Sequence, residues 1–465
     1  MRRPHLALLA ALLAACGQPP PPAPVTLVLV PLATTGGERD AEQRGLLGLL
    51  ATRLRAMRNL TLVIDAAGCE TKGAQHALRL SRRLTPSSDL SAFELQDCQS
   101  GNRRQETFVS PRSARRDWSA AASWWVGQQL GLSMSQPGSS DVLGEQAMGQ
   151  YLSALGHLQR RTGPDVAQAR RLLLALVEQE PDFAAGHAEL AIAELLASEY
   201  GLQPAADAIV RANVAIDAAL AIDANLGLAH AARGLSQMVA GRYRDALPLL
   251  VRAHRLEPGH DGILLWLGNA HLYSGQPLQA LPWLQTVIDI NPGLVAAHIS
   301  IAEAHCYAGQ DEACREALTH APDTPMRDYV TALLAGHRGD HVAVIAQLKT
   351  NAPAVASDWI DGLLGQSCRA MARGDCATPV AIIDAPIAPE SIEADLWQLD
   401  LGLAPALRQA QTDSRIAEAL RAEVTRLQQG GMRLPILTAL IGCLEGSGNP
   451  DPALPRLLGC EPPHL

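Results

Sequence analysis

Small and helix-terminating residues return every 34 positions in the middle of this chain, and this period restricts the possible folds more than any other feature. The repeated residues are Gly234, Gly268 and Ala302 at the eighth position, Gly241, Gly275 and Gly309 at the fifteenth, Ala246, Ala280 and Cys314 at the twentieth, and Pro258 and Pro292 at the thirty-second. Small residues let two helices approach each other, glycine permits a turn between them, and proline ends the second helix. Because each helix pair exposes an apolar face that the next pair covers, the period predicts an α-solenoid.

The register resembles the tetratricopeptide repeat. The resemblance implies a mainly α fold, with helical repeats over residues 148–390 and a helical cap over residues 391–465. Pro181 ends an earlier unit, and Ala224 takes the proline position of the next, which is lengthened near Ser198 to Ala206. Beyond about residue 325 the register weakens, although Gly339 and Gly374 still indicate hairpin turns.

In tetratricopeptide proteins the first helix of each unit lines a concave, peptide-binding groove. The resemblance therefore assigns a groove to Leu228, Ala231, Leu235, Met238, Val239, Leu265, Asn269, Leu272, Tyr273, Ile299, Glu303 and Tyr307. A peptide there would meet mainly apolar side chains, with Asn269 facing its backbone. The alternative is that these positions pack against a neighbouring superhelical turn or the amino-terminal module. The several Lys, Arg and Asn of a carboxylate clamp are absent, so capture of chaperone tails is not expected.

Residues 25–133 lack this register and alternate between β-rich and helical segments. We expect strands at 25–32, 60–64, 78–84, 93–96 and 106–109, and helices at 43–57 and 118–132. The order is similar to the small α/β amino-terminal module of TolB, and the matching motifs are Leu29-Val30-Pro31-Leu32, Gly73-Ala74, Asp97 to Gly101, and Leu130-Gly131-Leu132. The resemblance implies a non-catalytic interaction or sensory module, in which the usual second helix is shortened to residues 66–72.

The first 24 residues have the pattern of an export signal. Arg2 and Arg3 precede a short apolar run, and Leu13-Ala14-Ala15-Cys16 resembles the bacterial lipobox. That resemblance implies a signal peptide over residues 1–15, a lipid anchor on Cys16, and an outer-membrane lipoprotein facing the periplasm, because Gly17 is not aspartate. The alternative is an ordinary secretory signal with a chance cysteine. The proline-rich residues 18–24 would form an extended tether.

Eight cysteines remain once Cys16 is assigned to lipid, and an even number in an exported chain favours disulfides. Their clustering favours four neighbouring pairs, with free buried thiols as the alternative. The predicted pairs are Cys69–Cys98, Cys306–Cys314, Cys368–Cys376 and Cys443–Cys460.

No sequence motif nominates a catalytic, cofactor or metal site. His187, His230 and His298 share the fourth repeat position and His271 and His305 the eleventh, so a packing role is expected. His337 and His341 flank the turn expected at Gly339. A net charge of -9 without a basic run excludes nucleic acid as the expected partner. The leading hypothesis is a non-catalytic, envelope-anchored adaptor that binds a protein or peptide. The alternatives are a sensory component of an envelope signalling system and, less favoured, an enzyme with an unfamiliar site.

Overall fold

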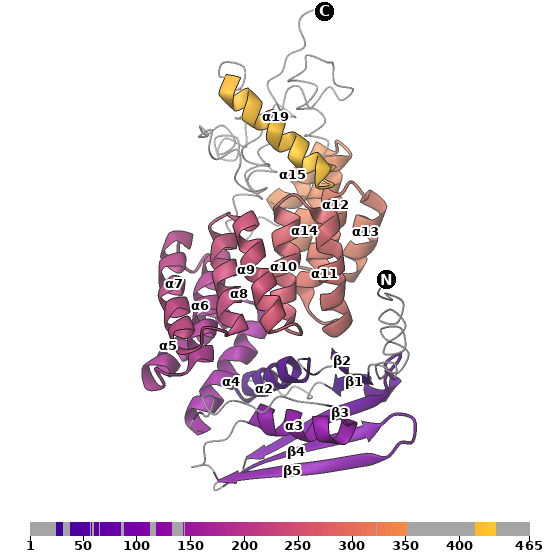
Figure 1. The fold of residues 1–465 in the computed structure, drawn as a ribbon. Coiled ribbons are helices and arrows are strands. Elements are labelled where there is room, and N and C mark those ends of the chain that lie inside the picture. The colour runs from indigo at the N-terminus through magenta and orange to yellow at the C-terminus, as the bar shows by residue number, and fades with distance from the viewer. Residues whose placement is uncertain are drawn as a thin grey trace, which may run out of the picture.

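The chain divides into a sheet-containing module and a curved stack of helices (Figure 1). This description rests on a computed structural model that describes residues 25–30, 38–55, 57, 60–64, 66–84, 88–111, 118–132, 143, 145–321, 323–350 and 414–433. The signal, the tether, Gly374 and most of the predicted cap lie outside the described residues.

The amino-terminal module is a five-stranded sheet with helices on one face (Figure 1). Its elements are β1 (Val25–Val30), α2 (Glu38–Arg55), β2 (Leu60–Ile64), the 3-10 turn η1 (Gly68–Glu70), β3 (His76–Leu84), β4 (Ser88–Asp97), β5 (Arg103–Pro111) and α3 (Trp118–Leu130). The strand order is β2-β1-β3-β4-β5. Strand β1 runs parallel to both of its neighbours, and β3, β4 and β5 form an antiparallel meander. All five predicted strands and both predicted helices are present.

The two faces of the central strands are buried in different ways. On one face Leu27, Leu29 and Phe93 belong to the core beneath α2 and α3. On the other face Val28 and Ala77 are also fully buried. Gly68 of η1 lies over them, because a Cβ there would stand 3.3 Å from Val30 Cγ2 and 3.8 Å from Ala77 Cβ. A short turn therefore covers the position where a second helix would otherwise pack.

The helical part is an α-solenoid of six consecutive helix pairs in the described chain, which confirms the predicted repeat fold. The helices are α4 (Glu145–Arg160), α5 (Gly163–Gln179), α6 (Ala184–Glu199), α7 (Ala205–Ile222), α8 (Gly227–Val239), α9 (Tyr243–Leu256), α10 (Asp261–Tyr273), α11 (Pro277–Ile290), α12 (Val295–Tyr307), α13 (Asp311–His320), α14 (Pro325–His337) and α15 (His341–Thr350). The α8–α9, α10–α11, α12–α13 and α14–α15 turns each contain a glycine with positive φ, from 68° to 86°. We number the pairs as units one to six.

The packing inside each unit explains the sequence period. A Cβ on Gly234 would lie 2.7 Å from Leu250 Cγ, and a Cβ on Gly268 would lie 2.7 Å from Leu284 Cδ2. The eighth position must therefore stay small, since the second helix of the unit presents a leucine to it. The same contact recurs one period later, as a repeated sequence requires.

Unit two departs from this period by lengthening its helices. Helices α6 and α7 contain 16 and 18 residues, whereas α8 and α9 contain 13 and 14. The residues expected as an insertion near Ser198 to Ala206 thus partly extend the two helices. Glu194 of α6 joins the longer helices, because it accepts hydrogen bonds from Arg170 of α5 at 2.7 Å and Arg211 of α7 at 3.2 Å.

The module docks tightly on the first unit of the solenoid. Helix α2 packs against α4, and β2 also contacts α11. A Cβ on Gly45 of α2 would overlap the Leu152 carbonyl, and a Cβ on Gly156 of α4 would overlap the Ala41 carbonyl. The two backbones therefore touch, so the module and the solenoid share one continuous core.

Candidate functional site

The predicted groove residues lie together on α8, α10 and α12, but most of their side chains are buried. Asn269 and Val239 are only partly buried. The residues below 9% exposure are Leu228, Ala231, Leu235, Met238, Leu265, Leu272, Tyr273, Ile299, Glu303 and Tyr307. In this conformation the face is closed to a large ligand at these ten positions.

Buried polar side chains cross this face from unit to unit. Tyr273 of α10 donates a hydrogen bond of 2.9 Å from its hydroxyl to Glu303 Oε2 of α12. The hydroxyls of Tyr307 and Tyr329 are 3.1 Å apart, and the rings of Tyr243 and Tyr273 are 5.3 Å apart. Burial, followed by the adjacent Glu303 carboxylate, raises the pKa of the Tyr273 hydroxyl well above its usual value, so this hydroxyl remains a donor.

Tyr243 and Tyr329 were absent from the predicted groove. Tyr243 begins the second helix of its unit. Tyr329 lies on α14, where the repeat register is weak. A rule that selects fixed positions on first helices therefore misses both, although each touches a predicted residue.

One polar atom of Asn269 on this face is unsatisfied. Within the described part of the chain, Asn269 Oδ1 is buried and has no hydrogen-bond partner. A buried acceptor without a partner costs roughly 1–3 kcal/mol. An N–H group supplied by a ligand would satisfy it.

A second group of residues at the first-helix face was not predicted either. Burial, followed by the charge of Glu257, raises the pKa of Glu189 on α6 to about 8.

The Arg161 guanidinium of unit one lies 6.0 Å from the Trp266 ring centroid in unit four. Arg161 is also the one non-glycine residue with positive φ among the described residues, at 47°, and its carbonyl accepts the Tyr200 hydroxyl at 2.5 Å. The first and fourth units therefore meet at this position.

Two of the four predicted cysteine pairs are disulfides in the structure. Cys69 of η1 is bonded to Cys98 at the β4–β5 turn, and Cys306 of α12 is bonded to Cys314 of α13. Cys16 and the remaining candidates Cys368, Cys376, Cys443 and Cys460 lie outside the described residues. Each observed bond joins two neighbouring elements, so both have a structural role.

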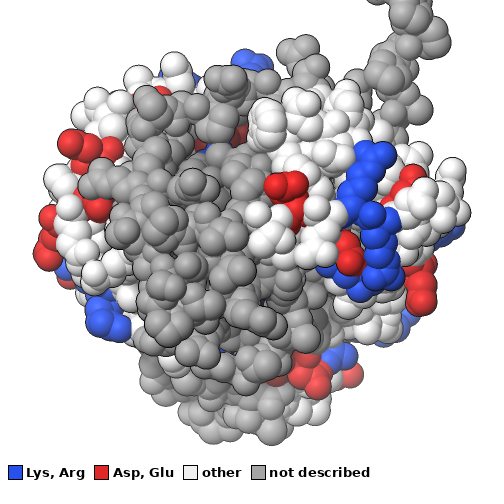
Figure 2. Space-filling model, turned by 90° about the horizontal axis from the view of Figure 1, so that it is seen from below, with Lys and Arg blue, Asp and Glu red and all other residues white. Residues whose placement is uncertain are grey.

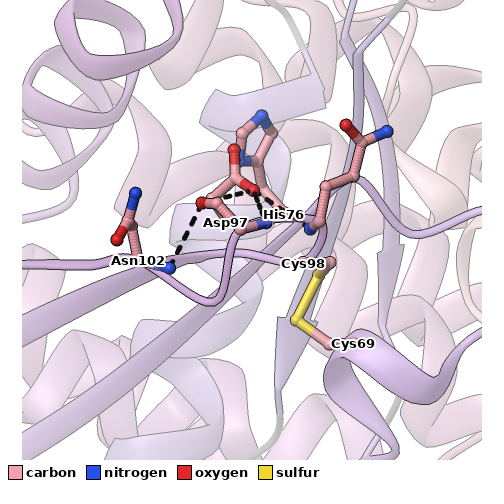
Figure 3. The surroundings of a disulfide bond; sticks show 7 residues. Cys69, His76, Asp97, Cys98 and Asn102 are labelled. Atoms are coloured by element: carbon pink, nitrogen blue, oxygen red, sulfur yellow. Dashed lines mark hydrogen bonds and ion pairs between the residues drawn. A yellow bond between two sulfur atoms is a disulfide. The ribbon is translucent and has the colours of Figure 1, made fainter.

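The Cys69–Cys98 bond lies beside a turn organised by Asp97 (Figure 3). Asp97 Oδ1 accepts the backbone N–H groups of Gln99 at 3.0 Å and Ser100 at 2.7 Å. The Ser100 backbone hydrogen bond is the largest of several effects that lower the pKa of Asp97, and the charge of His76, 3.9 Å away, adds to them. The disulfide and this turn together hold η1 against the sheet.

The recurrent histidines have repeated backbone partners. His187, His230 and His298 place Nε2 2.9, 3.1 and 2.7 Å from the carbonyl oxygen six residues earlier. His271 and His305 place Nδ1 2.9 and 2.7 Å from the glutamine side-chain oxygen five residues later. His337 and His341 lie on different helices, as the glycine between them predicts. No group of three or more metal-ligating side chains occurs among the described residues.

Acidic and basic side chains are mixed on the described surface. On the face in Figure 2, a band of Lys and Arg at the right of the view is bordered by Asp and Glu. No helix in the described ranges is both long and apolar enough to cross a membrane.

No family model matches the chain, and no curated protein does. Among solved structures, it is similar to Pseudomonas aeruginosa pilF, with 20% identity over 44% of this chain and 91% of that chain and a TM-score of 0.33. A tetratricopeptide repeat protein from Parabacteroides merdae shares 14% identity over 60% and 99%, with a TM-score of 0.35. YrrB, a tetratricopeptide protein with an unusual peptide-binding site, shares 18% over 38% and 89%, with a TM-score of 0.28.

These likenesses are too distant to transfer a ligand or a partner to this chain. The fold rests instead on the chain's own helix pairs, turn glycines and repeated small-residue contacts. The protein is a tetratricopeptide-type α-solenoid preceded by a small α/β module.

Proposed function

We propose that this protein is a non-catalytic scaffold of the bacterial envelope that binds an extended segment of another protein on the first-helix face of its solenoid. The observation that carries the proposal is the unsatisfied Asn269 Oδ1 in the middle of that face. A peptide backbone N–H supplies the missing donor, while neighbouring apolar and tyrosine side chains contact the peptide side chains.

The burial of the neighbouring residues sets a condition on binding. Leu265, Tyr273 and Glu303 are at most 7% exposed. A client must therefore bind a more open arrangement of this face. Its apparent affinity equals the affinity of the open form multiplied by the fraction of chains that are open. The proposal thus predicts a partner of modest affinity.

Anchoring to the envelope rests on the lipobox-like residues 13–16 and the proline-rich residues after them. A lipid on Cys16 would tether the module and solenoid to the outer membrane, facing the periplasm. The scaffold then acts on envelope proteins that come within reach of the tether.

The test is cross-linked capture from bacterial envelopes with the wild-type chain and Asn269→Ala. Because Oδ1 has no partner in the described chain, Asn269→Ala should leave the unfolding midpoint unchanged or raise it, while capture of the client falls at least threefold. The matched control is Gln279→Ala, which removes a side-chain amide from an exposed position of α11.

A protein captured by the wild type and the control but lost with Asn269→Ala identifies the client. Equal capture by all three chains would reject the first-helix face and direct attention to residues 25–133. If the wild type captures no protein, the scaffold proposal fails. The sensory alternative then becomes the better hypothesis, and it predicts an effect on envelope gene expression when the chain is deleted.

A further inference from the structure

Helix α19 (Ser414–Gln429), yellow in Figure 1, lies across the turns inside units three to five of the solenoid. We call the segment 414–433, which consists of α19 and the four residues after it, the strap. The strap forms one hydrogen-bonded contact with each of these units in order: Glu423 with Arg244 in unit three, Arg426 with Ser274 in unit four, and Arg433 with Tyr307 in unit five. A single continuous segment therefore joins three consecutive units.

A buried carboxylate anchors the strap to unit three. Glu423 is 5% exposed and accepts hydrogen bonds from Arg244 Nη2 at 3.1 and 3.2 Å. Arg426 donates to the same carboxylate at 2.8 and 2.6 Å. Because Glu423 lies between two guanidinium groups, replacing it by lysine would bring three positive charges together and should detach the strap at this point.

The strap packs against the backbone of the next two turns. Its apolar side has three fully buried residues at helical spacing, which are Leu420, Val424 and Leu427. In unit four, a Cβ on Gly275 would overlap Leu427, and in unit five a Cβ on Gly309 would stand 2.6 Å from Arg433 Cβ. The contact is therefore close enough to resist a change in the spacing of these units.

The strap contacts lie on or beside the tyrosines that close the first-helix face. Arg244 directly follows Tyr243, and Ser274 directly follows Tyr273. The carbonyl of Tyr307 itself accepts the Arg433 backbone N–H at 2.8 Å. Tyr273 in turn contacts the Tyr243 ring of unit three and a carboxylate of unit five. The strap thus fixes the turn ends of the same units whose side chains close the face.

Opening the first-helix face requires units three to five to move relative to one another, and a helix attached to all three opposes that movement. We propose that the strap is an autoinhibitory contact, which keeps the face closed to a client until the strap is released. This inference rests on the function proposed above and assigns a regulator to the same site. Release of the strap raises the fraction of open chains, and the apparent affinity for the client rises in proportion.

The first test measures amide hydrogen exchange in the full-length protein. Glu423→Lys reverses the anchoring charge, and Glu418→Lys is the matched control at an exposed position of the same helix. Glu423→Lys should raise exchange in α8, α10 and α12 about tenfold, because exchange follows the population of the open form. Exchange in α4 of unit one, which lies away from the strap in Figure 1, should not change.

Two exchange patterns would overturn the proposal. A rise of equal size in all six units would show a general loss of stability, and α8, α10 and α12 that exchange as in the control would show that the strap does not close the face. Arg244→Glu breaks the same anchor from the solenoid side, with Arg242→Glu as its exposed control, and should give the same pattern as Glu423→Lys. Circular dichroism verifies that each variant is folded.

A second measurement separates this inference from the function on which it rests. In cross-linked capture from envelopes, Glu423→Lys should recover up to about ten times as much client as the wild type. Adding Asn269→Ala should remove most of that gain. An open face without a gain in capture would overturn the autoinhibitory role. If no chain captures a client, the proposed function fails, whereas the exchange pattern still decides whether the strap closes the face.

Discussion

The repeated histidines can in principle bind a metal or donate a hydrogen bond, and their surroundings decide between these roles. The sequence places His187, His230 and His298 at one repeat position, and the structure places each ring beside a backbone carbonyl at the start of its unit. A ring nitrogen that donates to a carbonyl is unavailable to a metal. The repeat register was therefore a better guide to these side chains than their individual chemistry.

At the residue scale, the pKa of Glu189 predicts a pH dependence of stability. The carboxyl titrates near 4.5 in an unfolded chain and near 8 when folded, so between these values only the folded state keeps its proton. Stability should fall as pH rises through this window, at up to about 1.4 kcal/mol per pH unit. Glu189→Gln should therefore raise the unfolding midpoint relative to wild type at about pH 8 and much less at about pH 5.

The matched control is Glu178→Gln, on the exposed side of α5. Its midpoint should follow the wild type at both pH values. A Glu189→Gln variant that also follows the wild type across the range would show that the carboxyl is ionised in the folded protein.

At the element scale, the contact between α2 and α4 depends on two glycines. A Cβ on Gly156 would overlap the Ala41 carbonyl of α2, so Gly156→Ala should force the helices apart. We expect a loss of about 1–3 kcal/mol in the free energy of unfolding, measured by urea denaturation. Gly163→Ala is the control, because the nearest atom to its Cβ would be 3.9 Å away. An unchanged Gly156→Ala midpoint would contradict the close crossing.

The Cys306–Cys314 disulfide is a second determinant at this scale, since it joins the two helices of unit five. Replacing both cysteines by alanine should lower the free energy of unfolding by about 2–3 kcal/mol, because a short closed loop is released in the unfolded chain. A reductant should lower the urea midpoint of the wild type toward that of the variant and affect the variant less. If the two chains unfold together without reductant, the bond contributes nothing to stability.

At the scale of the whole molecule, the proposed lipid anchor predicts where the protein is found. Cys16→Ser removes the only thiol in the lipobox-like motif, so the chain should move from the membrane fraction to the soluble fraction of the envelope. Fractionation followed by detection of a metabolically incorporated fatty acid measures both effects. A variant that stays in the membrane fraction and still carries label would reject Cys16 as the anchor.

The arrangement of the whole molecule also decides whether the predicted groove residues are exposed or buried. Sequence positions assigned Leu235, Leu265 and Ile299 to an open surface, and the structure buries all three. A repeat consensus describes contacts within a unit and between adjacent units. The consensus contains no information on contacts between units that are not adjacent in sequence. The contact between Arg161 of unit one and Trp266 of unit four therefore could not be predicted.

The sequence by itself determined the elements that local spacing encodes. The 34-residue period predicted the helix pairs and their turn glycines, alternating apolar residues predicted the five strands, and clustered cysteines predicted Cys69–Cys98 and Cys306–Cys314. Only the tertiary structure decided the contacts between distant segments, such as α2 on α4 and Arg244 on Glu423. It also decided that Asn269 Oδ1 has no hydrogen-bond partner among the described residues. The physical reason is that periodicity reports which side of an element is apolar, whereas the surface that covers that side depends on the path of the whole chain.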